Sequence, residues 1–176
     1  DFVGNSVLLE DSCKVITVPF KKKILHVQPD RLKSELEFTP LQERDLEEAL
    51  DKIAKNSVRE KLWYGSFDVP ILMTGVSTEF GVIRTSQERG RTIHKALDLT
   101  ADPKSVIWAS NSGVIVLKDR FTHSGNTIVI DHGCGIVSMY FHLHDFADVQ
   151  VGQKVKKGNP LGRMGMTGFA NGQHLD

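Results

Sequence analysis

The second part of this chain, from about residue 65 onward, is a series of short apolar runs separated by glycine and proline turns. Runs of roughly 4–8 residues that are rich in β-branched side chains and end at such turns are typical of strands. The predicted strands are Val106–Ala109, Gly113–Asp119, Thr127–Asp131, Ile136–His142, Pro160–Met164 and a last one that begins at His174. We therefore expect a mostly β fold for this part of the chain.

The first part of the chain has a different texture. Its β-branched segments Lys14–Phe20 and Lys23–Val27 predict two short strands, and Pro19 favours a sheet edge for one of them. We place the boundary between the two parts at about Tyr64 to Val69. Residues 1–66 would then form a small α+β accessory segment, and residues 67–176 a separate, mostly β domain.

A helix is expected within the accessory segment. The stretch Thr39–Gln42 offers a capping hydroxyl, a proline at the first helical position and a glutamine three residues after the cap. Leu46, Leu50 and Ile53 then repeat at helical spacing, while charged side chains cover the other face. The helix should therefore begin at the proline and end near Ser57, with one apolar stripe packed against the rest of the protein.

Charge and composition argue against several classes of protein. The chain has 22 Lys+Arg and 22 Asp+Glu residues, so it lacks the basic excess of nucleic-acid-binding proteins. No stretch approaches the roughly 20 apolar residues that cross a bilayer, and the first residues do not form a signal peptide. The protein is therefore either cytoplasmic or lacks its targeting segment in this chain. Cys13 and Cys134 are too few for a disulfide framework or a cysteine-rich metal site; we expect buried thiols, with a single bridge as the alternative.

Polar motifs in the second part point to a metal site. They are His94-x-x-x-Asp98, the segment Tyr140–His144 with histidines at its third and fifth positions, the turn Gly165–Gly168, and the closing His174-Leu-Asp176. Residues two or four apart share a face of a strand, and residues four apart share a face of a helix. Zinc binds imidazole nitrogen and carboxylate oxygen, and a catalytic zinc site uses three protein ligands and a water. The motifs together therefore predict a zinc site.

Each motif also has a simpler explanation when it is taken alone. A lone His-x-x-x-Asp is common by chance, exposed histidines occur on many strands, and a glycine-rich segment often forms ordinary turns. We assign no chemistry to His132, His26 or His123. The sequence contains no His-Glu-x-x-His, no Gly-x-Ser-x-Gly and no P-loop, which excludes those catalytic classes.

In their order along the chain, the motifs resemble the lysostaphin or LytM type of zinc metallopeptidase. That family has a spaced His-x-x-x-Asp, a Tyr-x-His-Leu strand, and a Gly-x-Thr-Gly turn leading to His-Leu-His. The resemblance covers about Phe67 to the end and includes the supporting segments Glu79–Arg84, Gly125–Gly133 and Val149–Gly158. It implies a LytM-like antiparallel β-sheet domain. The first half resembles the accessory segment that precedes the catalytic domain in some envelope members.

The resemblance also implies roles for individual residues. His94 and Asp98 would be zinc ligands, and Asp176 stands at the third ligand position, where the family has histidine. His142 and His174 would be the catalytic histidines. A His/Asp/Asp site is chemically allowed, although it is more negative and makes the zinc-bound water less acidic. His144 is the nearby imidazole that could substitute, and the family continues through a further strand, so the domain looks truncated at its C-terminal end.

The function that the resemblance implies is zinc-dependent hydrolysis of peptide cross-links in bacterial peptidoglycan. Zinc-activated water would be the nucleophile, and the two histidines would handle protons and the oxyanion. The protein would act in the cell envelope, in the periplasm or outside the cell, on peptidoglycan peptide stems. The alternative, motivated by the aspartate at position 176, is a degenerate LytM-like module without catalysis that binds the cell wall or activates a cell-wall amidase or another envelope protein.

Overall fold

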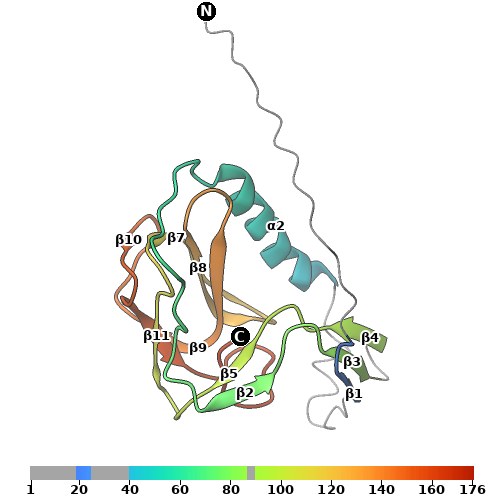
Figure 1. Ribbon diagram of the computed structural model, residues 1–176. Coiled ribbons are helices and arrows are strands. Elements are labelled where there is room, and N and C mark those ends of the chain that lie inside the picture. The colour runs from blue at the N-terminus through green and yellow to red at the C-terminus, as the bar shows by residue number, and fades with distance from the viewer. Residues whose placement is uncertain (1–18, 25–39, 87–89) are drawn as a thin grey trace, which may run out of the picture.

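The structure is a computed structural model, and it describes residues 19–24, 40–86 and 90–176 (Figure 1). Most of the two strands predicted before residue 28 lies outside these residues, as do Cys13, His26 and the capping Thr39. The one described strand there is β1 (Lys22–Ile24). None of the described helices is long and apolar enough to cross a membrane.

A six-stranded antiparallel sheet forms the body of the protein, with the strand order β10-β7-β8-β9-β11-β6. Its strands are β6 (Val106–Trp108), β7 (Gly113–Phe121), β8 (Gly125–Asp131), β9 (Val137–Phe146), β10 (Lys154–Val155) and β11 (Pro160–Met164). Five of them match predicted strands to within a few residues. The prediction of a mostly β, antiparallel fold is therefore confirmed.

Two smaller sheets lie beside the main one. In one, β2 (Gly75–Thr78) pairs with β5 (Asp98–Thr100). In the other, β3 (Ile83–Ser86) pairs in parallel with β1 and antiparallel with β4 (Gly90–Ile93). Strand β1 comes from the predicted accessory segment, whereas β3 belongs to the predicted domain. The described part of the accessory segment is thus joined to the rest by a strand pairing, and the domain boundary at Tyr64 to Val69 stays a prediction.

Helix α2 (Pro40–Asn56) begins at the predicted proline and ends within one residue of the predicted end. Leu46, Leu50 and Ile53 are half-buried, as the apolar stripe requires. Just after the helix, the Ser57 hydroxyl donates a hydrogen bond of 2.7 Å to the carboxylate of Asp131. The end of the helix is therefore fastened to the turn between β8 and β9, in agreement with its position in Figure 1.

The core lies between the curled main sheet and the strands that cover it. Its fully buried aliphatic side chains are Ile107, Ile115, Ile128, Ile130, Leu143 and Leu161. Burying one such side chain contributes roughly 1.5–3 kcal/mol. Leu143 and Leu161 come from β9 and β11, so the core fixes the two strands whose ends carry the polar motifs.

The prediction of a strand that begins at His174 is wrong. Among the described residues, this segment makes only two isolated pairings, Leu99 with Leu175 and Gly165 with His174. These two pairings nevertheless decide the geometry of the site.

Candidate metal centre

Asp98 and Asp176 come together because β5 pairs with the segment at the end of the chain. Leu99 and Leu175 exchange two backbone hydrogen bonds of 2.7 and 2.9 Å, and both side chains are buried in the core. Successive side chains of an extended chain point to opposite faces. The neighbours of the two leucines, Asp98 and Asp176, therefore lie opposite each other on the other face, away from the core.

His94 lies just after β4, and its side chain lies beside Asp98. Backbone hydrogen bonds with Gly81 and Val82 hold it just after β4. The chain then turns and enters β5 at Asp98, which brings His94 Nε2 within 2.9 Å of Asp98 Oδ1. The two residues do meet, but the reason expected from the sequence is wrong: they share neither a helix nor a strand, since β4 ends at Ile93.

Three buried polar atoms in this cluster have no hydrogen-bond partner: His94 Nε2, Asp98 Oδ1 and Asp176 Oδ1. The short contact between His94 and Asp98 therefore lacks the alignment of a hydrogen bond. The ligand atoms of these three residues all lie within 4.8 Å of one another. A buried polar atom without a partner is costly, and the expected explanation is a missing hydrogen-bond partner or ion.

The second oxygen of Asp98 has a partner of its own. Arg84 Nη2 lies 3.0 Å from Asp98 Oδ2, and the aspartate side chain is 8% exposed. This contact leaves Oδ1 facing His94 and fixes the orientation of the carboxylate. In the sequence, Arg84 stands out only as part of a supporting segment and has no role of its own. Its approach to Asp98 depends on the pairing of β3 with β4.

The two carboxylates respond in opposite ways to their surroundings. Burial tends to raise the pKa of Asp98, but its contacts with His94 and Thr78 outweigh this and lower the pKa. Burial, followed by the negative charge of Asp98, raises the pKa of Asp176. Two carboxylates this close compete for ionisation unless a cation lies between them.

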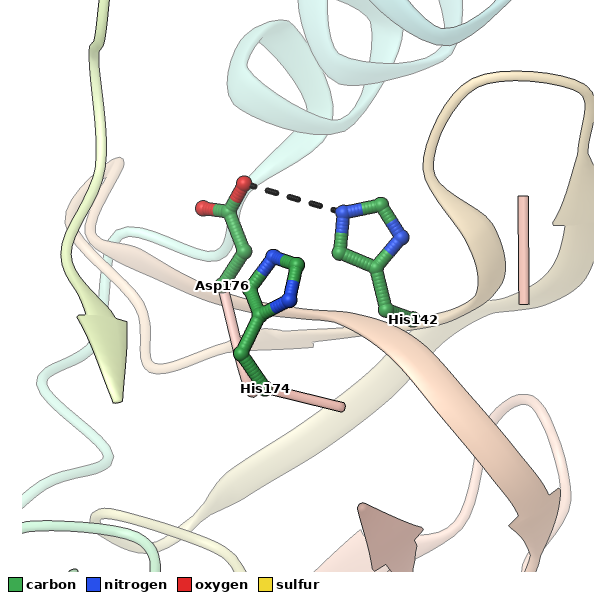
Figure 2. Close-up of side chains that lie close together, drawn as sticks. All are labelled: His142, His174 and Asp176. Carbon is green, nitrogen blue, oxygen red and sulfur yellow. Dashed lines mark ion pairs between the residues drawn. The ribbon is translucent and has the colours of Figure 1, made fainter. Parts of the chain in front are cut away.

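His142 and His174 face the same cluster, and Figure 2 shows their rings beside Asp176. Their ring centroids lie 4.8 Å apart, and His142 Nε2 lies 3.9 Å from Asp176 Oδ2. His142 has a positive φ of 60°, a strained conformation for a side chain of this size and one that is common at functional sites. Burial lowers the pKa of His142 to about 4, so the ring is neutral near pH 7.

Both of these rings are oriented by backbone carbonyls. His142 Nδ1 lies 2.8 Å from the Thr167 carbonyl oxygen, and His174 Nδ1 lies 2.9 Å from that of Gly172. Because a carbonyl oxygen only accepts, each Nδ1 carries the proton, and in the neutral ring each Nε2 keeps a free lone pair. The two lone pairs point toward Asp176 and Asp98.

The glycine-rich turn Gly165–Gly168 approaches the backbone of neighbouring segments closely. A side chain at Gly165 would collide with the backbone of His144, and one at Gly168, whose φ is 74°, with the backbone of Gly125. The turn can therefore press against the β7–β8 connection. This contact brings the Thr167 carbonyl to His142.

The other histidines lie outside the cluster. His144 was expected to share a face with His142, but His142 is buried and His144 is exposed, since the positive φ at His142 breaks the strand alternation. His132, in the connection between β8 and β9, is fully buried, and His123 stacks on Phe169. Cys134 was expected to be buried; it is an exposed free thiol.

The donor set fits a zinc ion. One imidazole nitrogen and two carboxylate oxygens are ligand types that zinc accepts, and all three atoms are buried without partners. His174 and Asp176 keep 15% and 18% of their side chains exposed, so solvent reaches one side of the cluster. The residues present thus provide three ligand atoms and an open side.

Comparison with known proteins identifies the second part of the chain. Residues 92–176 match Peptidase family M23. The chain is 32% identical over 112 residues to the DD-carboxypeptidase/endopeptidase Mpg of Neisseria meningitidis and 34% identical over 82 residues to the peptidoglycan DD-endopeptidase ShyA of Vibrio cholerae. These matches cover 63% and 47% of this chain, but only 26% and 19% of those relatives.

Solved structures share the fold. A peptidase M23 from Pseudomonas aeruginosa aligns with a TM-score of 0.62 at 29% identity, covering 76% of this chain and 52% of that one. A zinc-containing peptidase from Vibrio cholerae aligns with a TM-score of 0.58 at 25% identity, covering 63% and 35%. The resemblance to lysostaphin- and LytM-type metallopeptidases is confirmed, and residues 92–176 of the chain match Peptidase family M23.

Proposed function

We propose that this chain is the catalytic part of a zinc-dependent endopeptidase that cuts peptide cross-links of bacterial peptidoglycan. The observation that carries the proposal is the buried cluster of three unpartnered ligand atoms, with the Nε2 atoms of two histidines directed at it. The M23 match and the relatives named as peptidoglycan endopeptidases support the substrate class. The protein would act in the cell envelope, where peptidoglycan lies.

His94, Asp98 and Asp176 would hold the metal, with Arg84 orienting Asp98. When bound, zinc polarises a carbonyl group and makes water a nucleophile near neutral pH. His142 and His174 would manage the protons of the reaction at their Nε2 atoms, because each Nδ1–H is committed to a backbone carbonyl. Once protonated, either ring would donate a hydrogen bond to the developing oxyanion.

The bond cut is proposed to be the DD cross-link. The relatives Mpg and ShyA carry the names DD-carboxypeptidase/endopeptidase and DD-endopeptidase. Because this chain spans at most about a quarter of their length, we extend only the bond class to it and not their other properties.

Digestion of purified sacculi tests the proposal. The unchanged chain should release muropeptides, a chelator should stop the release, and added zinc should restore it. His94→Ala should abolish release. The matched control is His144→Ala, which removes an exposed imidazole from β9 and should leave release unchanged. Release that survives both the chelator and His94→Ala would contradict the zinc assignment.

The second candidate is a module without catalysis that binds the cell wall or activates a cell-wall amidase. It is favoured by Asp176, which replaces the histidine of the family pattern and whose pKa is raised by burial and by Asp98. Under this candidate, binding to sacculi survives His94→Ala and no muropeptides appear under any metal condition. Release that depends on zinc excludes it.

A further inference from the structure

We propose that the centre holds a second cation, bound by His142, His174 and Asp176 and bridged to the first by the Asp176 carboxylate. This inference rests on the first zinc site of the proposed function. The ligand atoms of His142, His174 and Asp176 lie within 4.8 Å of one another, as do those of His94, Asp98 and Asp176. Asp176 is the one residue that belongs to both groups.

The Asp176 carboxylate could bridge two ions because it has two oxygen atoms. Asp176 Oδ2 faces His142 Nε2 at 3.9 Å, while Asp176 Oδ1 is buried and has no hydrogen-bond partner. The two oxygens can therefore serve different ions. A histidine at this position presents a single lone pair when neutral and can bind only one ion in the cluster. In two-metal hydrolase sites the ions lie about 3.5–4 Å apart, a span that one bridging carboxylate covers.

The two histidines are already oriented as metal ligands are. A metal-binding histidine usually donates its other ring N–H to a backbone carbonyl or a carboxylate, which fixes its tautomer. His142 and His174 both do so, to Thr167 and Gly172. Figure 2 shows the two rings and the carboxylate converging from β9 and from the end of the chain.

The chemistry of the group selects the ion. Two imidazole nitrogens and one carboxylate oxygen favour zinc or a similar borderline divalent cation over calcium or magnesium, which prefer oxygen ligands alone. The second ion would occupy the lone pairs that the proposed mechanism needs for proton transfer. Excess zinc should therefore inhibit hydrolysis, while the first ion activates it.

Zinc titration followed by calorimetry and elemental analysis tests this inference on the whole chain. We expect about two zinc ions per chain at saturation. The double variant His142→Ala/His174→Ala should bind about one, and so should Asp176→His, which gives an independent answer if the double variant does not fold. His144→Ala is the matched control and should keep about two. In the cobalt-loaded protein, two bridged ions should show magnetic coupling in electron paramagnetic resonance.

The outcomes separate this inference from the proposed function. About one ion in the unchanged chain, with the same number in Asp176→His, overturns the second site and leaves the first intact. No bound ion overturns both. About two ions that persist in Asp176→His also overturn the bridging role of Asp176.

Discussion

Two buried polar clusters in the described part of this protein contain histidine, and they differ in whether their polar atoms have hydrogen-bond partners. The first surrounds His132 at one end of β8, and the second is the centre formed by His94, Asp98 and Asp176. In the first, the ring nitrogens of His132 both have partners, the Ser112 carbonyl at 2.7 Å and the Ser138 hydroxyl at 2.8 Å. In the second, three buried atoms have none.

The His132 cluster forms a connected chain of hydrogen bonds. Burial lowers the pKa of His132, so the ring is neutral, its Nδ1–H donates to Ser112, and its Nε2 accepts from Ser138. The Ser138 and Tyr140 hydroxyls lie 3.0 Å apart, and Tyr140 accepts from the Ser110 N–H at 2.9 Å. Among the described residues, no buried side-chain atom of this hydrogen-bond network lacks a partner, so the network has no free atom for an ion.

This difference indicates which buried polar group is structural and which would bind a ligand. Burial alone marks both clusters. In the structure, the presence or absence of hydrogen-bond partners separates them, in line with the motif that singles out His94 and not His132. We therefore assign His132 to stability and the second cluster to metal binding, and the following changes test that division.

The largest effect is expected for His94→Ala. Removing a ligand should reduce zinc affinity more than the roughly 10–100-fold that is lost with an outer hydrogen-bond partner, so activity should disappear. Zinc retention and muropeptide release measure it. His132→Ala is the comparison: zinc retained equally poorly by both variants would erase the distinction between the clusters.

His132→Ala should instead cost about 3 kcal/mol in the free energy of unfolding, because it removes the partner of the Ser112 carbonyl, breaks the hydrogen bond with the Ser138 hydroxyl and opens a cavity. Denaturant unfolding of the zinc-free chain measures the loss. His144→Ala, on the exposed part of β9, controls for the loss of an imidazole. An unfolding free energy equal to that of the control would show that the network does not stabilise the fold.

Arg84→Gln should weaken zinc binding by roughly 10–100-fold, since Asp98 loses the partner that orients it. Arg163→Gln is the matched control, since it removes a guanidinium paired with Asp145 on the surface. Equal zinc affinities for the two variants would contradict a role for Arg84.

The smallest effect is a pH dependence of stability. The pKa of His132 is lower in the folded than in the unfolded chain, where it is about 6.5, so below that pH the unfolded chain binds more protons. Stability should be full above pH 7 and fall as the pH decreases through 6.5, by no more than about 1.4 kcal/mol per pH unit from this residue. His132→Asn should make this fall less steep, and the part that remains would come from His142, whose pKa burial also lowers; an unchanged slope would show that His132 does not titrate in this way.

Much of the fold could be predicted from the sequence because it follows local patterns. The helix at Pro40–Asn56 and the strand Pro160–Met164 were predicted to within one residue, since capping residues and glycine turns mark their ends. The pairing of Leu99 with Leu175, which joins residues distant in sequence, could not be predicted from local patterns.

The candidate site was predicted as a set of residues but not as a geometry. The motifs indicated His94, Asp98, His142, His174 and Asp176, and the structure brings all five together. The contact of Arg84 with Asp98 depends on long-range strand pairing, and the exposure of His144 depends on the positive φ at His142. Neither has a local signal.

The proposed function requires that the cluster of His94, Asp98 and Asp176 binds zinc. The most direct test is the zinc content of the purified chain and of His94→Ala after exhaustive dialysis against metal-free buffer, measured by elemental mass spectrometry. We expect at least about one tightly held zinc ion in the chain and almost none in the variant. A chain that retains no zinc, or a variant that retains as much as the unchanged chain, would contradict it.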